Sequence, residues 1–356
     1  MIKILHSADW HLDAPMQGFT PEQRALLQKN LLNIPGKLAA ICKAEKCDLV
    51  LLAGDLFDGP YTKESFYAVK NALEEMAVPV FITPGNHDFC SVSSPYLTEL
   101  WPDNVHIFTR PVVESVALPQ LSCRIYGAGY TSMECQSLLQ DFSLTGAEKY
   151  HIGVLHADPA ATESTYSPLT RQQIAASGLS YLALGHIHKG GELYAGSTLC
   201  RWPGCPMGKG YDEDGEKGVL IAEIGDDVTC RFLPLDTPRF YDLYVDAEDA
   251  PAAVLDRLLP PLGNDNFYRI TLTGPSEKPD LAALYRDFSR FPNLLLRDNT
   301  QPPLDIWGSA GEDSLEGMYF KILQDQLAGA EETQRRRILL AARISRQILN
   351  GQEVEL

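Results

Sequence analysis

Short clusters of Asp, His and Asn recur along residues 1–190, and these side chains can bind metal ions or transfer protons. In chain order the clusters are Asp9-Trp10-His11, Gly54-Asp55-Leu56-Phe57-Asp58, Gly85-Asn86-His87-Asp88, His156 and Gly185-His186-Ile187-His188. Imidazole, carboxylate and amide groups without thiolate suit a divalent ion such as Mn2+, Fe2+ or Zn2+. Seven of these side chains are candidate ligands: Asp9, His11, Asp55, Asn86, His156, His186 and His188. Because seven ligands are too many for one catalytic ion, the pattern favours two ions that share a bridging carboxylate and clamp a phosphoester.

Each cluster follows a segment that the sequence predicts to be a buried strand. These strands span 2–6, 48–53, 78–83, 151–156 and 181–184. Because α/β sheets place ligands beyond the carboxyl ends of their strands, we expect the clusters to share one crevice. Gly54, Gly85 and Gly185 are expected to let the backbone turn sharply beside the ions.

Helical patterns alternate with these strands. A helix should begin after Thr20, with Pro21 in its first position, and should be kinked or split at Pro35-Gly36. A second helix should open at Thr62, and two further strands are expected at 218–224 and 229–235. This alternation predicts a layered α/β domain.

The last third of the chain reads as two smaller parts. Beyond a seam at residues 236–238, strands at 240–246 and 268–273 alternate with helices at 251–259 and 280–288. Gln301-Pro302-Pro303 interrupts the chain again, and a helical segment follows, with Leu340, Ile344 and Ile348 on one face and Gly351 at its end. We therefore predict three domains, at residues 1–236, 237–303 and 304–356.

Composition narrows the class of protein. The 356 residues include 30 Lys and Arg against 47 Asp and Glu, a net charge of −17, which excludes a surface that attracts nucleic acid everywhere but leaves room for a local site. No apolar run approaches the length of a membrane span, and the N-terminus lacks the apolar core of a signal peptide. The eight cysteines form no C-x-x-C pair, which favours reduced thiols in the cytoplasm.

The order D-x-H, G-D-x-x-D, G-N-H-D, H, G-H-x-H resembles the calcineurin-like metallophosphoesterase superfamily. Finer stretches resemble its DNA-repair exonuclease branch, the SbcD-type nucleases and their shorter YhaO-like relatives; these stretches are 7–13, 54–58, 185–189, 203–208 and 215–219. The resemblance is strong over about residues 1–236. It implies a layered metallophosphoesterase β-sandwich flanked by helices, with a smaller α/β cap domain and a C-terminal helical segment that meets a partner.

The resemblance also implies a role for each residue of the clusters. The first metal ion is assigned to Asp9, His11, Asp55 and His188, and the second to Asp55, Asn86, His156 and His186, so that Asp55 is the bridge. His87 is expected to protonate the leaving oxygen or stabilise the transition state, and Asp88 to orient His87 by accepting its other ring proton. Mn2+ is the expected metal, with Fe2+ and Zn2+ as alternatives. Cys205 departs from the Ser or Asn common in the family.

Three functions remain open at this point. The leading hypothesis is a two-metal nuclease that cleaves DNA as the subunit of a cytoplasmic DNA-repair complex, with an SMC-like or AAA-type ATPase as partner; relatives also commonly dimerise. The acidic composition instead favours a phosphodiesterase or phosphatase for small phosphoesters or nucleotides. The apolar stripe of the C-terminal segment favours an interaction subunit of an ATPase complex. Five arginines on that segment either solvate the helix or help it dock: Arg335, Arg336, Arg337, Arg343 and Arg346.

Overall fold

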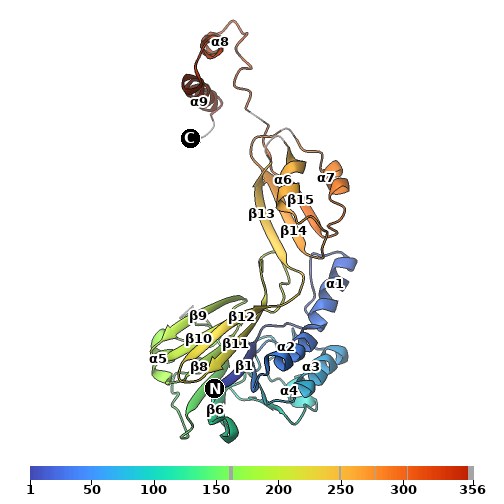
Figure 1. Ribbon diagram of the computed structural model, residues 1–356, viewed down its shortest axis with the longest axis vertical. Helices are drawn as coiled ribbons and strands as arrows, with labels where there is room; N and C mark the ends of the chain where they lie inside the picture. The colour runs from blue at the N-terminus through green and yellow to red at the C-terminus, as the bar shows by residue number, and fades with distance from the viewer. Residues whose placement is uncertain (160–162, 248–249, 277, 303, 352–356) are drawn as a thin grey trace. The chain divides into compact units, whose positions relative to one another are not determined.

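The computed structural model describes residues 1–159, 163–247, 250–276, 278–302 and 304–351 (Figure 1). The chain divides into two compact units. The first is Met1–Asp242 with Asp265–Tyr268, and the second is Leu243–Asn264 with Arg269–Leu356. Pro303 and the last five residues of the predicted C-terminal segment lie outside the described residues. The assignment of a cap domain and of a partner-docking segment stays a prediction. Within the described part of the chain, no helix is long and apolar enough to cross a membrane.

The N-terminal strand belongs to a six-stranded sheet with the order β12-β11-β1-β2-β3-β4. Its strands are β1 (Ile2–Ser7), β2 (Leu49–Leu52), β3 (Val80–Ile82), β4 (Val105–Ile107), β11 (Gly218–Ile224) and β12 (Val228–Pro234). Neighbours from β1 to β4 run parallel, and β11 and β12 add an antiparallel edge. Every residue of β2 is buried, as expected for a strand whose sheet is covered on both faces.

A second six-stranded sheet has the order β5-β6-β7-β8-β10-β9. Its strands are β5 (Glu114–Leu118), β6 (Cys123–Gly127), β7 (Tyr150–His156), β8 (Tyr181–Gly185), β9 (Lys189–Ala195) and β10 (Thr198–Gly204). Neighbours in the series β6, β7, β8 and β10 run parallel. The predicted strands at 151–156 and 181–184 match β7 and β8, whereas sequence analysis did not identify the other strands of this sheet.

Apolar side chains from the two sheets meet in a shared core, which includes Ile4, Leu51, Ile125 and Val154. The other face of the first sheet is covered by α1 (Pro21–Leu32), α2 (Ile34–Glu45) and α3 (Lys63–Met76), and that of the second sheet by α5 (Arg171–Ser177) (Figure 1). Two short helices, α4 (Pro95–Thr98) and η1 (Pro119–Leu121), lie in connections. The predicted layered β-sandwich flanked by helices is confirmed.

The predicted helix starts and the predicted split of the first helix are confirmed, but the position of the split differs from the prediction. Thr20 Oγ1 accepts a hydrogen bond from the backbone N–H of Gln23 (3.3 Å), and Thr62 caps α3 in the same way. The break falls at Asn33, not at Pro35-Gly36, because Pro35 lies in the first turn of α2. A proline is tolerated there, since the first N–H groups of a helix have no partner within it.

The second part of the chain contains a three-stranded sheet with the order β13-β14-β15. Its elements are β13 (Phe240–Asp246), α6 (Pro251–Leu258), β14 (Phe267–Thr273), α7 (Leu281–Asp287) and β15 (Leu294–Asp298). Two longer helices follow, α8 (Leu315–Ala328) and α9 (Glu332–Leu349). The predicted order of strand, helix, strand and helix matches β13 to α7, and β15 is an addition.

Arg346 on α9 is a structural residue and does not belong with the exposed arginines. Its guanidinium donates to Ser309 Oγ (2.6 Å) and to the carbonyl of Ile306 (3.2 Å), and it pairs with Glu316. Because these contacts bury Arg346, its face of α9 is the packed one. The predicted apolar stripe lies on another face, so that Ile348 is 60% exposed.

Candidate metal centre

The structure brings the seven predicted metal ligands together at the carboxyl ends of five strands. β1 leads to Asp9 and His11, β2 to Asp55, β3 to Asn86, β7 to His156, and β8 to His186 and His188. β1, β2 and β3 belong to the first sheet, and β7 and β8 to the second. The candidate centre therefore lies where the carboxyl edges of the two packed sheets meet, within the first compact unit.

One group of ligands surrounds His11. The carboxylate of Asp9 and ring nitrogens of His11 and His188 lie within 4.8 Å of one another. His11 Nε2 is 3.0 Å from His188 Nε2 and 3.7 Å from Asp55 Oδ2. These atoms match the ligand set expected for the first ion.

The second group surrounds His156. Its Nε2 atom is 2.9 Å from Asn86 Oδ1 and 3.4 Å from Asp55 Oδ2, and His186 Nδ1 is 3.3 Å from the same Asn86 oxygen. Asp55 Oδ2 therefore lies within 4 Å of a ring nitrogen from each group. This position fits the bridging role that we assign to Asp55.

Four of the seven candidate ligands have a strained backbone. Asp9, His11, Asp55 and His186 have φ angles of 56°, 50°, 53° and 96°. This left-handed region costs a residue other than glycine about 1–3 kcal/mol, and such strain collects at functional sites. The cluster of strained ligands supports a functional centre here.

Only one of the three predicted glycines has the positive φ of a sharp turn. Gly54 has φ +91°, and a Cβ atom on it would lie 2.4 Å from His156 Nδ1. At Gly85 a Cβ atom would lie 2.2 Å from Asp55 Oδ1, and at Gly185 it would lie 1.9 Å from the carbonyl oxygen of Ala53. Gly85 and Gly185 are thus required for close approach, which corrects our prediction for them.

Two acceptor oxygens lie close to Nε2 of His156 in the second group. His156 Nδ1 lies 2.9 Å from the carbonyl oxygen of Ala53 and must donate to it, because a carbonyl only accepts. If the ring carries no second proton, as a metal ligand requires, its Nε2 lone pair faces Asn86 Oδ1 and Asp55 Oδ2, which are also acceptors. Such an arrangement is repulsive by itself and fits a divalent cation held between these atoms.

The electrostatics of the centre agree with this donor set. Burial, together with the negative charge of Asp55, raises the pKa of Asp9 well above its usual range. Burial lowers the pKa of His11 and the pKa of His186 to about 4, so both rings are neutral at pH 7 and can offer a lone pair. Two crowded carboxylates beside neutral imidazoles fit bound cations.

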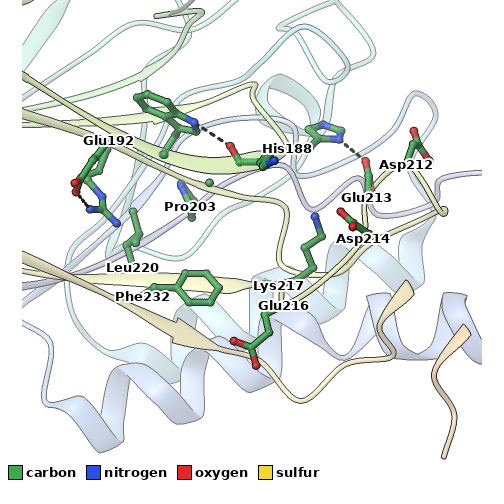
Figure 2. Close-up of a pocket in the computed structure, with 15 residues that line it drawn as sticks. His188, Glu192, Pro203, Asp212, Glu213, Asp214, Glu216, Lys217, Leu220 and Phe232 are labelled. Atoms are coloured by element: carbon green, nitrogen blue, oxygen red, sulfur yellow. Dashed lines mark hydrogen bonds and ion pairs between the residues drawn. The ribbon is translucent and has the colours of Figure 1, made fainter. Parts of the chain in front are cut away.

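Glu213 orients His188, and the sequence analysis did not identify it. His188 Nδ1 donates to Glu213 Oε1 (2.5 Å), and Figure 2 shows the carboxylate pointing at the ring. This bond leaves the Nε2 lone pair of His188 directed at the centre, which is how outer carboxylates orient histidine ligands. Although burial opposes it, the hydrogen bond from His188 helps lower the pKa of Glu213 to about 2. No spacing rule pairs residues 188 and 213.

Asp58, and not Asp88, orients His87. His87 Nδ1 donates to Asp58 Oδ1 (2.7 Å), and this bond raises the pKa of His87 above its usual value. The rings of His11 and His87 in turn lower the pKa of Asp58. His87 is the exposed member of the cluster, with 44% of its side chain accessible, so it can reach a substrate.

Asp88 instead ties together the loops that carry the ligands. It accepts hydrogen bonds from the backbone N–H groups of Leu56 (2.7 Å) and Gly85 (2.7 Å) and from the Tyr96 hydroxyl (2.5 Å). Burial, with the charge of Asp55, raises the pKa of Asp88 to about 6. The predicted partnership with His87 was wrong, because Asp88 bonds to these loop donors and His87 Nδ1 bonds to Asp58.

Cys205 is a buried packing residue. Its Sγ atom lies 3.7 Å from Glu213 Oε2 and from the carbonyl oxygen of His188. Burial raises the pKa of the Cys205 thiol to about 12, so it is protonated and is a poor metal ligand. All eight cysteines are free, as expected for reduced thiols.

The calcineurin-like phosphoesterase family matches residues 2–190, which carry all the candidate ligands. The chain belongs to this family. It is 29% identical over 246 residues to the uncharacterized metallophosphoesterase YhaO of Bacillus subtilis strain 168, a match that covers 65% of this chain and 60% of that protein. It is 26% identical over 285 residues to the D subunit of the nuclease SbcCD from the same strain, covering 67% of this chain and 71% of that one.

Solved structures of the same fold include a dimetal phosphatase from Danio rerio. The TM-score is 0.44 and the sequence identity 11%, with 65% of this chain and 95% of that chain covered. A second is TT1561 of Thermus thermophilus, with a TM-score of 0.39, 12% identity, and coverage of 65% and 98%.

Proposed function

We propose that this protein hydrolyses DNA phosphodiester bonds with two divalent metal ions, as the nuclease subunit of a DNA-repair complex. The observation that carries the proposal is the convergence of two ligand groups, in which ring nitrogens of His11 and His156 both lie within 4 Å of Asp55 Oδ2, with the exposed His87 beside them. The first ion is assigned to Asp9, His11, Asp55 and His188, and the second to Asp55, Asn86, His156 and His186.

Divalent ions held by these residues, Mn2+ in our proposal, would supply Lewis acidity to a phosphoester oxygen. The protein's own contribution is a proton donor on the rim. Asp58 holds His87 through Nδ1 and favours the charged ring, so that Nε2 is the nitrogen free to donate a proton to the leaving oxygen. Asp88 keeps the loops of Asp55 and Asn86 in register while this occurs.

The choice of DNA rests on the relatives and on the motifs. Two proteins that match two thirds or more of this chain are each named as the D subunit of the nuclease SbcCD, from Bacillus subtilis and Staphylococcus epidermidis. The stretches at 7–13, 54–58 and 185–189 resemble the same nuclease branch. Because those relatives are subunits of a larger nuclease, we also propose an ATPase partner.

The helices α8 and α9 are the proposed docking site for that partner. They expose a set of large apolar side chains: Leu315, Met318, Ile322, Leu340, Ile348 and Leu349. Exposed apolar side chains gathered on two helices suit a helix-in-groove interface. A partner of positive charge would offset the net charge of −17, which opposes DNA binding by this chain alone.

A second candidate function is hydrolysis of small phosphoesters or nucleotides. A pocket of about 730 Å³ adjoins His188 (Figure 2). Its basic side chains are Lys189, Arg201 and Lys217, and its acidic ones are Glu192, Asp212, Glu213, Asp214 and Glu216. This acidic excess disfavours a long polyanion and favours a small substrate.

One assay separates the two functions. The Mn2+-loaded protein is offered single- and double-stranded DNA, bis-p-nitrophenyl phosphate and mononucleotides, with Asp55→Ala and His87→Ala as inactive controls. We expect metal-dependent cleavage of DNA and of the small diester. Cleavage of small esters without action on any DNA, also with an ATPase partner present, would establish the second function instead. Two bound ions without any hydrolysis would favour an interaction subunit.

A further inference from the structure

Lys209 places a buried ammonium group beside the candidate metal centre. It lies in the connection between β10 and β11. Its Nζ atom is buried and has no hydrogen-bond partner among the described residues. Among the described residues it pairs with Glu213 Oε1 at 3.8 Å, which is beyond hydrogen-bonding distance. A buried charge without acceptors is costly, so the fold retains this group at the expense of stability.

Glu213 connects Lys209 to the ligands. Its Oε1 atom accepts from His188 Nδ1 (2.5 Å), while its Oε2 atom accepts from the backbone N–H of Lys209 (2.8 Å). The carboxylate that orients His188 thus also fixes the position of the lysine backbone. At 3.8 Å the Glu213 carboxylate pairs with the ammonium by charge but accepts no hydrogen bond from it, which leaves the donors of Nζ available to another acceptor.

The charge of Lys209 reaches the residues of the centre. Burial is the main cause of the raised pKa of Asp9 and of the lowered pKa of His11. The positive charge of Lys209 opposes the first shift and adds to the second. The same charge acts on His87, the proposed proton donor. The ammonium therefore lies within electrostatic reach of the ligands and of the donor. Two bound cations would repel it, and an anion between them would hold it in place.

We propose that Lys209 binds a non-bridging phosphoryl oxygen of the phosphoester at the metal centre. This inference rests on the proposed function, because it takes the same centre as the reaction site. An ammonium group has three donors and no acceptor, and phosphoryl oxygens are acceptors. The bound substrate thereby supplies the partner that Nζ lacks in the chain.

Equilibrium binding of inorganic phosphate tests the proposal on the full Mn2+-loaded chain. Isothermal titration should show at least about tenfold weaker phosphate binding by Lys209→Met, the loss expected for a charged hydrogen bond. Lys209→Arg should restore most of the affinity. As a matched control, Lys149→Met removes an exposed lysine that pairs with Asp226 and should bind phosphate like the unmodified protein. Equal phosphate affinity for Lys209→Met and the unmodified protein overturns the proposal.

A structural role for Lys209 predicts different results. Since Nζ makes no hydrogen bond and its ion pair with Glu213 is long, the metal-free Lys209→Met protein should unfold close to the temperature of the unmodified protein. A fall of several degrees would assign Lys209 to the fold and overturn the proposal. Hydrolysis of bis-p-nitrophenyl phosphate by the unmodified protein tests the proposed function separately. Lysine-dependent phosphate binding without hydrolysis would support anion binding by Lys209 and overturn the proposed function.

Discussion

Two histidine–carboxylate pairs flank the candidate centre, and they differ in what the second ring nitrogen faces. His87 Nδ1 bonds to Asp58 at 2.7 Å, and His188 Nδ1 bonds to Glu213 at 2.5 Å. Nε2 of His188 lies 3.0 Å from His11 Nε2, whereas Nε2 of His87 takes part in none of the hydrogen bonds recorded for the described residues. In our proposal, the same histidine–carboxylate arrangement supports metal binding in one pair and proton donation in the other.

His11 stands between the two pairs. Its ring centroid is 4.6 Å from that of His87 and 4.9 Å from that of His188. In the pair at His188, Glu213 lies 3.8 Å from the Lys209 ammonium. In the other pair, Asp58 lies 3.9 Å from His11 Nδ1. The difference teaches that the surroundings of a histidine, more than its carboxylate partner, determine its role.

The largest expected effect separates proton donation from metal binding. His87→Gln should lower kcat for bis-p-nitrophenyl phosphate by about 10²- to 10⁴-fold, because it removes the proton donor. Its Mn2+ affinity, measured by isothermal titration, should remain close to that of the unmodified protein. A large loss of Mn2+ affinity would make His87 a ligand and break the contrast between the pairs.

The next effect concerns the carboxylate of the other pair. Glu213→Ala should weaken the binding of one metal ion by about 10- to 100-fold, because His188 loses the group that orients its ring. Glu213→Gln keeps a hydrogen-bond acceptor and should recover part of the affinity. Asp214→Ala changes an exposed carboxylate on the same loop and serves as the control. Equal losses for Glu213→Ala and Asp214→Ala would show a general charge effect.

Asp58→Asn tests the pair at His87 and should have a smaller effect. The variant keeps an acceptor but loses the negative charge that favours the protonated ring, and we expect a fall in kcat of about tenfold. Asp88→Asn should instead lower the free energy of unfolding by about 1–3 kcal/mol, because it removes an acceptor of buried backbone N–H groups. If Asp88→Asn lowered kcat and Asp58→Asn lowered only the free energy of unfolding in urea, Asp88 would be the residue that orients His87.

His6 gives the smallest effect and serves as a reference without a carboxylate. Its Nε2 donates to the carbonyl of Leu184 and its Nδ1 accepts from the Tyr181 hydroxyl, while burial lowers the pKa of His6 to about 3. The unfolded chain binds this proton near pH 6.5, so stability is lost as the pH falls from about 6.5 toward 3. His6 should therefore lower the free energy of unfolding at pH 5 by about 2 kcal/mol relative to pH 8.

Urea unfolding of the unmodified protein and of His6→Gln, at pH 5 and pH 8, measures this pH-dependent contribution of His6 to stability. The variant retains a donor for Leu184 but cannot be protonated, so its stability should depend less on pH. An unchanged pH dependence would show that His6 does not remain neutral in the folded protein.

Much of the candidate site could be predicted because it depends on local sequence. The runs that form β2 and β8 are apolar throughout, which identifies buried strands, and polar clusters at their ends identify Asp55, His186 and His188 as candidates. The assignment of Asp88 failed because Asp58 and Asp88 have equal claims by residue type. The backbone donors that satisfy Asp88 come from two different loops, and no spacing reveals them.

The sequence by itself determined which residue types follow which strands, because strand burial and turn chemistry depend on neighbours along the chain. Only the tertiary structure decided which carboxylate serves which histidine, since His87 and Asp58 are 29 residues apart and His188 and Glu213 are 25 apart. It also decided that Lys209 Nζ is buried without a hydrogen-bond acceptor, while the two terminal guanidinium nitrogens of Arg346 have acceptors. These outcomes depend on how loops from two sheets pack, because hydrogen bonds and charge interactions are set by distances in space and not by separation along the chain.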